Sequence, residues 1–285
     1  MPNQIKALIL DVDGVIVGDA GQANFPIPNS KILGRLKSIR RSGIPVVLCT
    51  SRPVYSVQKI IDKAGLNNIH IGLAGGTLVD PIDNIVLEKH PIDPKIAAEI
   101  TKVYLDNEVY TEMYGIDNYY LQKDQSRKLT EQHTKILQAE PILVDSLLEL
   151  VEKIDVYKIL PVASNEDEQK QLDEMFQLFA KDLAIGWAVH PSIKLHKWGN
   201  ITAKDISKRH AAHKISEFLD IGLDEMLGVG DGLADWQFIE LCGYKAAMGN
   251  SDQRLIDLVN ASPNSYVGKS IDEDGILDIL DHYEL

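Results

Sequence analysis

The hydrophobic positions of the chain fall into short apolar runs that alternate with amphipathic segments. Short apolar runs bounded by polar residues predict buried strands, and apolar residues spaced three or four apart predict helices. In the first part of the chain, strands are predicted at residues 7–10, 44–49 and 69–73, and helices at about 29–43 and 54–63. Strands and helices that alternate in this way predict right-handed crossovers and a parallel sheet.

The pattern changes after about residue 83 and returns near residue 200. In between, alternating segments such as 118–122 mix with predicted helices at 94–105, 131–138, 145–154 and 165–178. Beyond residue 200, a helix is predicted at 207–219, closed by Gly222, then a strand at 226–231 and short elements at 245–248, 255–259, 266–268 and 275–282. We predict an α/β protein with a Rossmann-like parallel-sheet core, residues 1–83 plus 199–285, and an inserted α+β domain, residues 84–198.

Two acids follow the first predicted strand. Asp11 and Asp13 are two residues apart, so they point to the same side, and Gly14 allows a tight turn after them. Ligands of open parallel sheets bind beyond the carboxyl ends of the strands, where these acids fall. Neighbouring carboxylates repel unless a cation or a shared proton separates them, which favours Mg²⁺. The alternative is an acidic turn without a ligand.

Three further polar clusters follow predicted strands or begin a helix. They are Thr50-Ser51-Arg52, Lys208, and the segment from Gly230 to Asp235. A crevice that gathers acids, a hydroxyl and a lysine suits phosphoryl transfer, which needs a nucleophile, charge neutralisation and a metal. Two residues have open alternatives: Arg52 contacts substrate or pairs with an acid, and Asp235 is a metal ligand or the N-cap of the helix that holds Trp236.

Composition limits the partners. The net charge is −13 over 285 residues, which argues against a nucleic-acid partner, and no segment predicts membrane insertion or attachment. Two cysteines, Cys49 and Cys242, are no disulfide framework, and residues 1–6 lack the features of a signal peptide. We expect a cytoplasmic protein.

Taken in order, the motifs resemble those of the haloacid dehalogenase (HAD) superfamily of phosphatases, in its Cof-type or type IIB, sugar-phosphatase-like branch. The matching segments are Asp11-Val12-Asp13-Gly14-Val15, Thr50-Ser51-Arg52, Ile206-Ser207-Lys208-Arg209, Gly230 to Asp235, and the late segments 246–250 and 273–276. The sequence departs from the family pattern at four places: Ser51, Arg209, Ala234 in place of an asparagine, and Gly75-Gly76 in place of Asn-Gly. The inserted module corresponds to the cap domain of this branch.

The resemblance implies roles for the acids. Asp11 is expected to attack phosphorus and form a phosphoaspartate, and Asp13 to act as the general acid and then the general base. Mg²⁺ is the implied cofactor, held by Asp11, the backbone carbonyl of Asp13, and Asp231, with Asp235 in direct or outer contact. The alanine at position 234 puts phosphate affinity and rate in question, because asparagine is expected there to help hold the phosphoryl group.

The resemblance also implies the substrate contacts. Thr50, Ser51 and Lys208 are expected to hold phosphoryl oxygens, and Arg52 and Asn250 are candidate substrate contacts. The expected reaction is Mg²⁺-dependent hydrolysis of a small phosphate monoester, a sugar phosphate or similar metabolite. The alternatives are a phosphosugar mutase of the phosphomannomutase type and a catalytically weak, regulatory protein that binds a phosphometabolite.

Histidines on the predicted helix 207–219 suggest a second metal site. His210 and His213 are three residues apart, and His196 lies upstream. Without a carboxylate partner, histidines at this spacing are typical of a helix surface, so we expect them to be surface residues.

Overall fold

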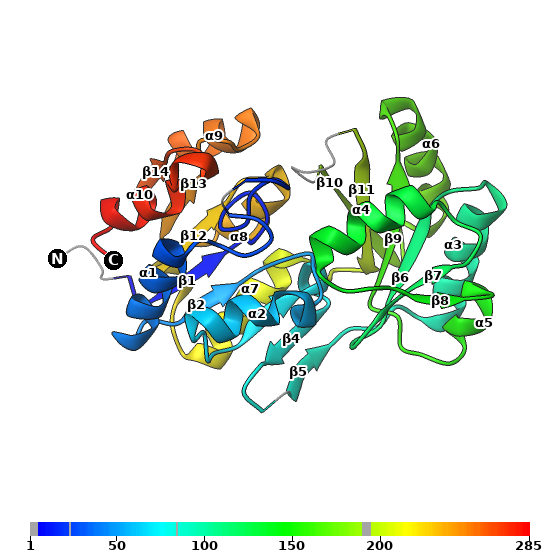
Figure 1. Ribbon diagram of the computed structural model, residues 1–285, viewed down its shortest axis with the longest axis horizontal. Coiled ribbons are helices and arrows are strands. Elements are labelled where there is room, and N and C mark those ends of the chain that lie inside the picture. The colour runs from blue at the N-terminus through cyan, green and yellow to red at the C-terminus, as the bar shows by residue number, and fades with distance from the viewer. Residues whose placement is uncertain (1–4, 23, 84, 190–194) are drawn as a thin grey trace.

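The computed structural model describes residues 5–22, 24–83, 85–189 and 195–285. A five-stranded parallel sheet forms one half of the molecule, on the left in Figure 1. Its strand order is β14 (Ser265–Val267), β13 (Tyr244–Ala247), β12 (Met226–Gly230), β1 (Ala7–Leu10) and β2 (Val46–Leu48). β12 and β1 are parallel neighbours and are followed by Asp231 and Asp11, which explains why these acids meet.

Both faces of this sheet are covered by helices, because alternate residues of its strands point to opposite sides. Leu8 and Leu10 belong to the core cluster that includes residues of α1, α2 and α10, and Ala7 and Ile9 to the one that includes residues of α7, α8 and α9. The helix bounds are α1 Ser30–Arg41, α2 Val54–Ala64, α7 Lys208–Leu219, α8 Trp236–Ile239, α9 Gln253–Asn260 and α10 Gly275–His282. The predicted doubly covered α/β core is confirmed.

Helix ends follow the local sequence. The Asn29 side chain accepts hydrogen bonds from the backbone N–H groups of Lys31 and Ile32, and α2 is followed by Gly65 in the left-handed conformation. The predicted end of α7 at residue 219 is confirmed, but its closure by Gly222 is wrong. The C-cap is Asp220, which adopts the left-handed conformation, one that aspartate tolerates better than most residues.

A six-stranded sheet forms the other half of the molecule, on the right in Figure 1. Its order is β10 (Leu183–Val189), β11 (Lys197–Ala203), β9 (Lys158–Ala163), β6 (Thr111–Tyr114), β7 (Tyr119–Gln122) and β8 (Ile142–Val144), all antiparallel except β7 with β8. One face packs against α3 (Pro94–Asp106), α5 (Leu147–Val151) and α6 (Glu166–Phe176), and the other against α4 (Arg127–Leu137). The α+β character predicted for the insertion is confirmed; of the strands in this sheet, only β7 falls on a segment named in the sequence analysis, 118–122.

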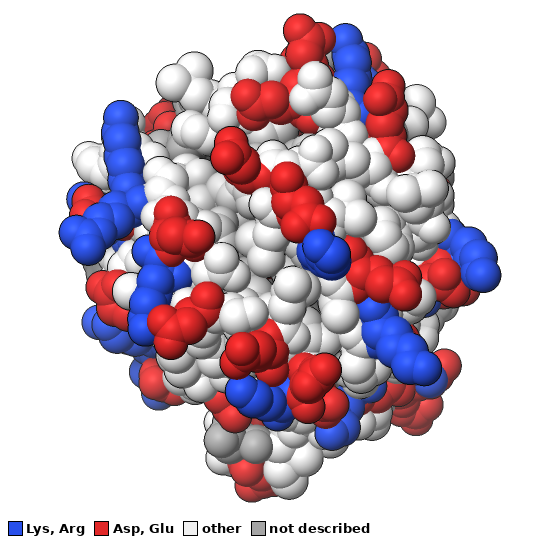
Figure 2. All heavy atoms as spheres, turned by 90° about the vertical axis from the view of Figure 1, so that its right-hand side faces the viewer, with Lys and Arg blue, Asp and Glu red and all other residues white. Residues whose placement is uncertain are grey.

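The α4 face of this sheet is turned toward the parallel sheet, since its core cluster includes Leu73 from the first part of the chain. In the view of the outer side of this half (Figure 2), acidic and basic side chains are interspersed instead of gathering into one basic patch. In the residues that the structure describes, no helix has the length and apolarity needed to cross a membrane.

A small antiparallel sheet joins the two halves. It comprises β3 (His70–Gly72), β4 (Thr77–Asp80) and β5 (Ile85–Lys89), and a bridge between Cys49 and Ile71 continues β2 onto β3. β5 thus pairs with β4 although it falls within 84–198, and β11 continues to Ala203. Residues 1–4, 23, 84 and 190–194 lie outside the described residues. The division at 83/84 and 198/199 stays a prediction.

Candidate active site

The loop after β1 places its acids at the carboxyl edge of the parallel sheet. Asp11 is 8% exposed, and its backbone N–H donates to the carbonyl of Val229 in the neighbouring strand. Gly14 has a φ of +80°, and a Cβ atom there would lie 1.9 Å from Asp231 Oδ2. The turn can therefore pass directly against Asp231 because residue 14 has no side chain.

Lys208 brings a positive charge to these acids from the first turn of α7. Its Nζ donates to Asp11 Oδ1 at 2.7 Å, to Asp235 Oδ1 at 2.6 Å and to the carbonyl of Cys49 at 3.1 Å. Burial would lower the pKa of Lys208, but Asp11 and Asp235 raise it well above its ordinary value. Lys208 therefore stays protonated as a fixed charge.

Asp235 holds the turn after β12. Its Oδ2 accepts hydrogen bonds from the backbone N–H groups of Asp231 at 3.1 Å and Gly232 at 3.0 Å, while Oδ1 faces Lys208. The alternative prediction, that Asp235 is the N-cap of the helix of Trp236, is met in position, because Asp235 directly precedes α8, but its side chain makes no capping bond to that helix.

Three carboxylates converge beside Lys208. One oxygen from each of Asp11, Asp231 and Asp235 lies within 4.8 Å of the others. Burial, together with Asp235, raises the pKa of Asp11 to about 7, and burial with both neighbours raises that of Asp231 well above its ordinary value. Hard oxygen donors packed this closely fit Mg²⁺, which would relieve their repulsion.

Arg52 connects Asp13 to the six-stranded half. Its Nε donates to Asp13 Oδ2 at 2.8 Å, its Nη2 contacts Asp13 Oδ1, and its Nη1 donates to the carbonyl of Ile136 in α4 at 2.7 Å. Of the two predictions for Arg52, pairing with an acid is the arrangement that the structure shows. The carboxylate of Asp13 faces Arg52 and is not part of the three-carboxylate cluster, and the ligand role of its backbone carbonyl stays a prediction.

The remaining predicted residues lie around this cluster. Thr50 is buried, and its hydroxyl accepts the backbone N–H of Arg52 at 3.1 Å. The carbonyl of Ser51 accepts a hydrogen bond from Lys158 of β9 at 2.8 Å. Asn250 ties two loops together, because its amide donates to the carbonyl of Gly14 and accepts from the N–H of Ile271. The substrate and phosphate roles of these side chains stay predictions.

A second buried charge cluster, unpredicted from the sequence, lies on the α4 face of the six-stranded sheet. Glu112 is fully buried and accepts from Tyr110 at 2.8 Å, Tyr114 at 2.6 Å and His133 Nδ1, also at 2.8 Å. Burial lowers the pKa of Lys158 to about 7, although Glu112 and Asp13 oppose this. In the sequence, Glu112 and Lys158 are single charged residues far apart in the inserted segment. Nothing in the sequence indicates that their side chains lie close together.

The whole chain matches one family. The sequence profile of haloacid dehalogenase-like hydrolases matches residues 8–280, and the chain therefore belongs to that family. The predicted HAD-type enzyme class is confirmed, and the curated relatives that match are named phosphatases.

Individual relatives match along almost their full length. Phosphatase YwpJ of Bacillus subtilis is 23% identical over 98% of this chain and 99% of YwpJ, and the phosphoglycolate phosphatase of Staphylothermus marinus is 25% identical over 92% and 94%. A haloacid dehalogenase-like hydrolase from Bacteroides thetaiotaomicron superposes with a TM-score of 0.81 at 16% identity, covering 98% of this chain and 99% of the other. The HAD subclass IIB sugar phosphatase BT4131 gives 0.78 at 20% identity, with the same coverage. The predicted fold, a HAD core with an inserted cap, is confirmed.

Proposed function

We propose that this protein is a Mg²⁺-dependent phosphatase that hydrolyses a small phosphate monoester, a sugar phosphate or similar metabolite, through a phosphoaspartate on Asp11. One observation carries the proposal: the buried Asp11, at the end of a central strand, is bonded to Lys208 and clustered with Asp231 and Asp235. In this position the Asp11 carboxylate can act as the nucleophile, and the positive charge of Lys208 can stabilise the phosphoryl group that it receives.

In the proposed reaction, a carboxylate oxygen of Asp11 attacks phosphorus while the bond to the leaving oxygen breaks. Asp13 gives its proton to that oxygen and then takes a proton from the water that attacks the phosphoaspartate, releasing phosphate and restoring Asp11. Lys208 neutralises charge on the phosphoryl oxygens. Since Arg52 pairs with the ionised form of Asp13, this pair has to separate before Asp13 can carry the proton that it gives to the leaving oxygen.

Asp11, Asp231 and Asp235 would hold the Mg²⁺ ion, with the backbone carbonyl of Asp13. The ion would neutralise charge so that an anionic nucleophile can approach an anionic phosphate. Lys208 lies against two of these three carboxylates, which keeps them in place for the ion.

The six-stranded half serves as a cap that chooses the substrate. Support comes from its contacts with the core, Arg52 to Ile136 and Lys158 to Ser51, which lie next to Asp13 and Thr50. The related enzymes differ in the phosphate ester that their names give, among them phosphoglycolate and pyridoxal phosphate. Contacts between the cap and the body of the substrate add binding energy, which favours sugar-sized esters over small aryl phosphates. A cytoplasmic location fits such a metabolite.

The experiment is a screen of phosphorylated metabolites with Mg²⁺, reading released phosphate, with the Asp11→Asn protein as the control. We expect release that stops in chelator, returns with Mg²⁺ and is not supported by Ca²⁺, whose looser coordination spoils in-line geometry. An isomerised ester with little free phosphate would instead identify a mutase. Binding without turnover across the screen would support the regulatory alternative that Ala234 suggests.

A further inference from the structure

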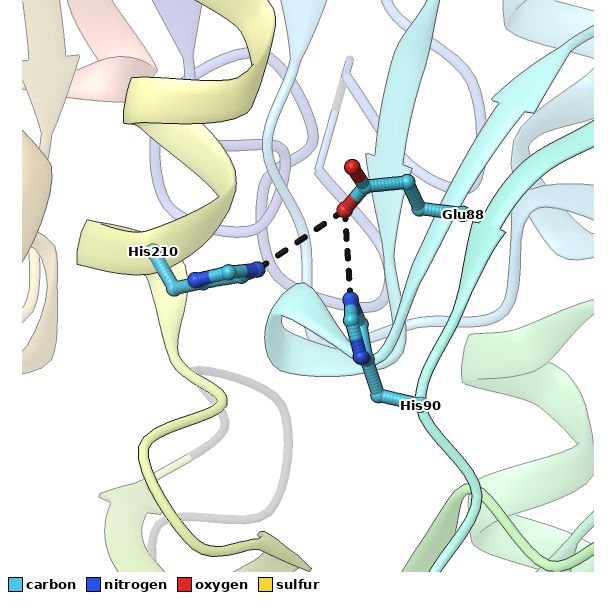
Figure 3. A group of neighbouring side chains, drawn as sticks. All are labelled: Glu88, His90 and His210. Carbon is cyan, nitrogen blue, oxygen red and sulfur yellow. Dashed lines mark hydrogen bonds and ion pairs between the residues drawn. The ribbon is translucent and has the colours of Figure 1, made fainter.

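A second group of metal-binding side chains lies away from the acids of the active site. Figure 3 shows Glu88 of β5, His90 just after that strand, and His210 of α7 converging across the gap between the two elements. Their side chains are 21%, 30% and 30% exposed, so the group lies near the surface of the molecule. Glu88 is a carboxylate partner for His210 that the sequence did not reveal. The prediction that His210 is an ordinary surface residue is therefore wrong. His213 is exposed, as expected.

Two of the three separations between donor atoms are close to those of a tetrahedral site. Both imidazoles present Nε2 to one oxygen, Glu88 Oε2, at 3.2 Å for His90 and 3.7 Å for His210, and the three ligand atoms all lie within 4.8 Å of one another. In a tetrahedron with bonds of about 2.1 Å, ligand atoms are about 3.4 Å apart. The two measured separations lie on either side of that value.

Hydrogen bonds alone do not account for the close approach of the His90 and His210 rings to Glu88. His210 Nε2 is buried and has no hydrogen-bond partner among the described residues, although it points at Glu88. The rings of His90 and His210 stand edge to face, with centroids 5.1 Å apart. Lys214 approaches the other carboxylate oxygen, Oε1, at 3.4 Å, which leaves Oε2 to the two histidines.

We propose that Glu88, His90 and His210 form a binding site for a divalent transition metal of the Zn²⁺ class. Two imidazoles and one carboxylate are a donor set that suits Zn²⁺ and not Mg²⁺, and partial exposure leaves the fourth position to water. The ion links the β4–β5 hairpin to α7. Because α7 begins with Lys208, the ion fixes the helix that supplies the active-site lysine.

The test is a titration of the metal-free protein with Co²⁺ and Zn²⁺ in a large excess of Mg²⁺, which occupies the oxygen site of Asp11, Asp231 and Asp235. We expect one equivalent of Co²⁺ with the visible absorption of a tetrahedral site, displaced by Zn²⁺, and a higher Tm with Zn²⁺. His90→Gln and His210→Gln, as well as His90→Ala and His210→Ala, should weaken binding by at least about tenfold.

His213→Ala is the matched control, because it removes a histidine from the same helix outside the cluster, and it should bind as the parent does. The variants should keep the parent Tm in chelator, which shows that they fold. The proposal is overturned if the parent protein binds no Co²⁺ in excess Mg²⁺, or if the His90 and His210 variants bind it as tightly as the parent. These readouts do not depend on phosphatase activity, so the proposed function and this site can fail separately.

Discussion

In the described part of the chain, a buried cluster of charge in the parallel-sheet half and one in the cap are organised in opposite ways. In the active-site cluster, four acids face two cations, Arg52 and Lys208, among the described residues. In the cap cluster, Glu112 has three hydrogen-bonding partners, one of them the imidazole of His133, and Lys158 lies nearby over the ring of Tyr114. The first cluster has surplus negative charge, and the second is satisfied by the protein itself.

Because of this difference, the active-site cluster favours the binding of a cation, and the cap cluster favours the folded state. Repulsion among buried carboxylates raises the free energy of the metal-free active site, and a cation recovers it. The cap cluster contains a buried acid whose pKa is lowered by His133 and the tyrosine hydroxyls despite its burial. Removing a group should therefore change activity and metal binding in the first cluster and stability in the second.

The largest expected effect is on turnover. Asp11→Asn keeps the shape of the side chain and removes the attacking oxygen, so phosphate release should fall by at least about 10³-fold. The measurement is phosphate release beside a thermal melt of both proteins. Turnover near the parent rate in a folded variant would contradict the phosphoaspartate mechanism.

The next effect is on stability. Glu112→Ala leaves His133 and two tyrosine hydroxyls without their buried partner and should cost about 3–5 kcal/mol in the free energy of unfolding. Glu149→Gln, on the exposed side of α5, is the control and should change it by less than about 0.5 kcal/mol. Denaturant unfolding measures both; equal effects would show that the cap cluster contributes nothing particular.

Metal binding tests the surplus charge directly. Asp231→Asn should raise the Tm in chelator, because one repelling carboxylate is gone, and should lose most of the stabilisation by Mg²⁺. In the parent protein, Mg²⁺ at a hundred times its Kd should add about 2.7 kcal/mol. A variant that is less stable in chelator and keeps the full response to Mg²⁺ would disprove this account of the cluster.

Position 234 should give a smaller gain. Ala234→Asn would add an amide beside Asp235, and a hydrogen bond to a charged phosphoryl group is worth ~1.5–3 kcal/mol, or about ten- to a hundredfold in kcat/KM. The gain should appear on a small aryl phosphate, for which the cap supplies little binding. Unchanged kinetics in a folded variant would mean that this position does not face the phosphate.

The smallest effect is a pH dependence of stability. With a folded-state pKa of about 7 and an ordinary value of 10.5, Lys158 binds fewer protons in the folded than in the unfolded chain between these pH values. Stability should therefore rise with pH, by about 1 kcal/mol from pH 7 to 8. Lys158→Met should remove this rise; an unchanged slope in thermal melts would exclude Lys158 as its source.

The two clusters also differ in how far the sequence predicts them. Asp11, Asp13, Asp231 and Asp235 occur in short motifs after predicted strands, and a parallel sheet brings such strand ends to one edge, so local pattern was sufficient. Lys208 begins a predicted helix, and its phosphate-binding role rests on the family resemblance. Glu112 and Lys158 meet through antiparallel pairing of β6 with β9, and Glu88 meets His210 through packing of a hairpin on a helix. These contacts depend on register and packing, which no local spacing encodes.

Gly14 and Gly75 limit how this sequence can vary. A Cβ atom at position 14 would meet Asp231, and one at position 75, where φ is +105°, would lie 2.4 Å from the carbonyl of Ser207, the N-cap of the helix that starts with Lys208. Neither glycine has a reactive group. Gly14 lies against Asp231, and Gly75 lies against Ser207, the residue that precedes Lys208. A library of single substitutions should therefore show positions 14 and 75 as intolerant as the charged residues, and the set of residues required for activity is larger than the set that performs the chemistry.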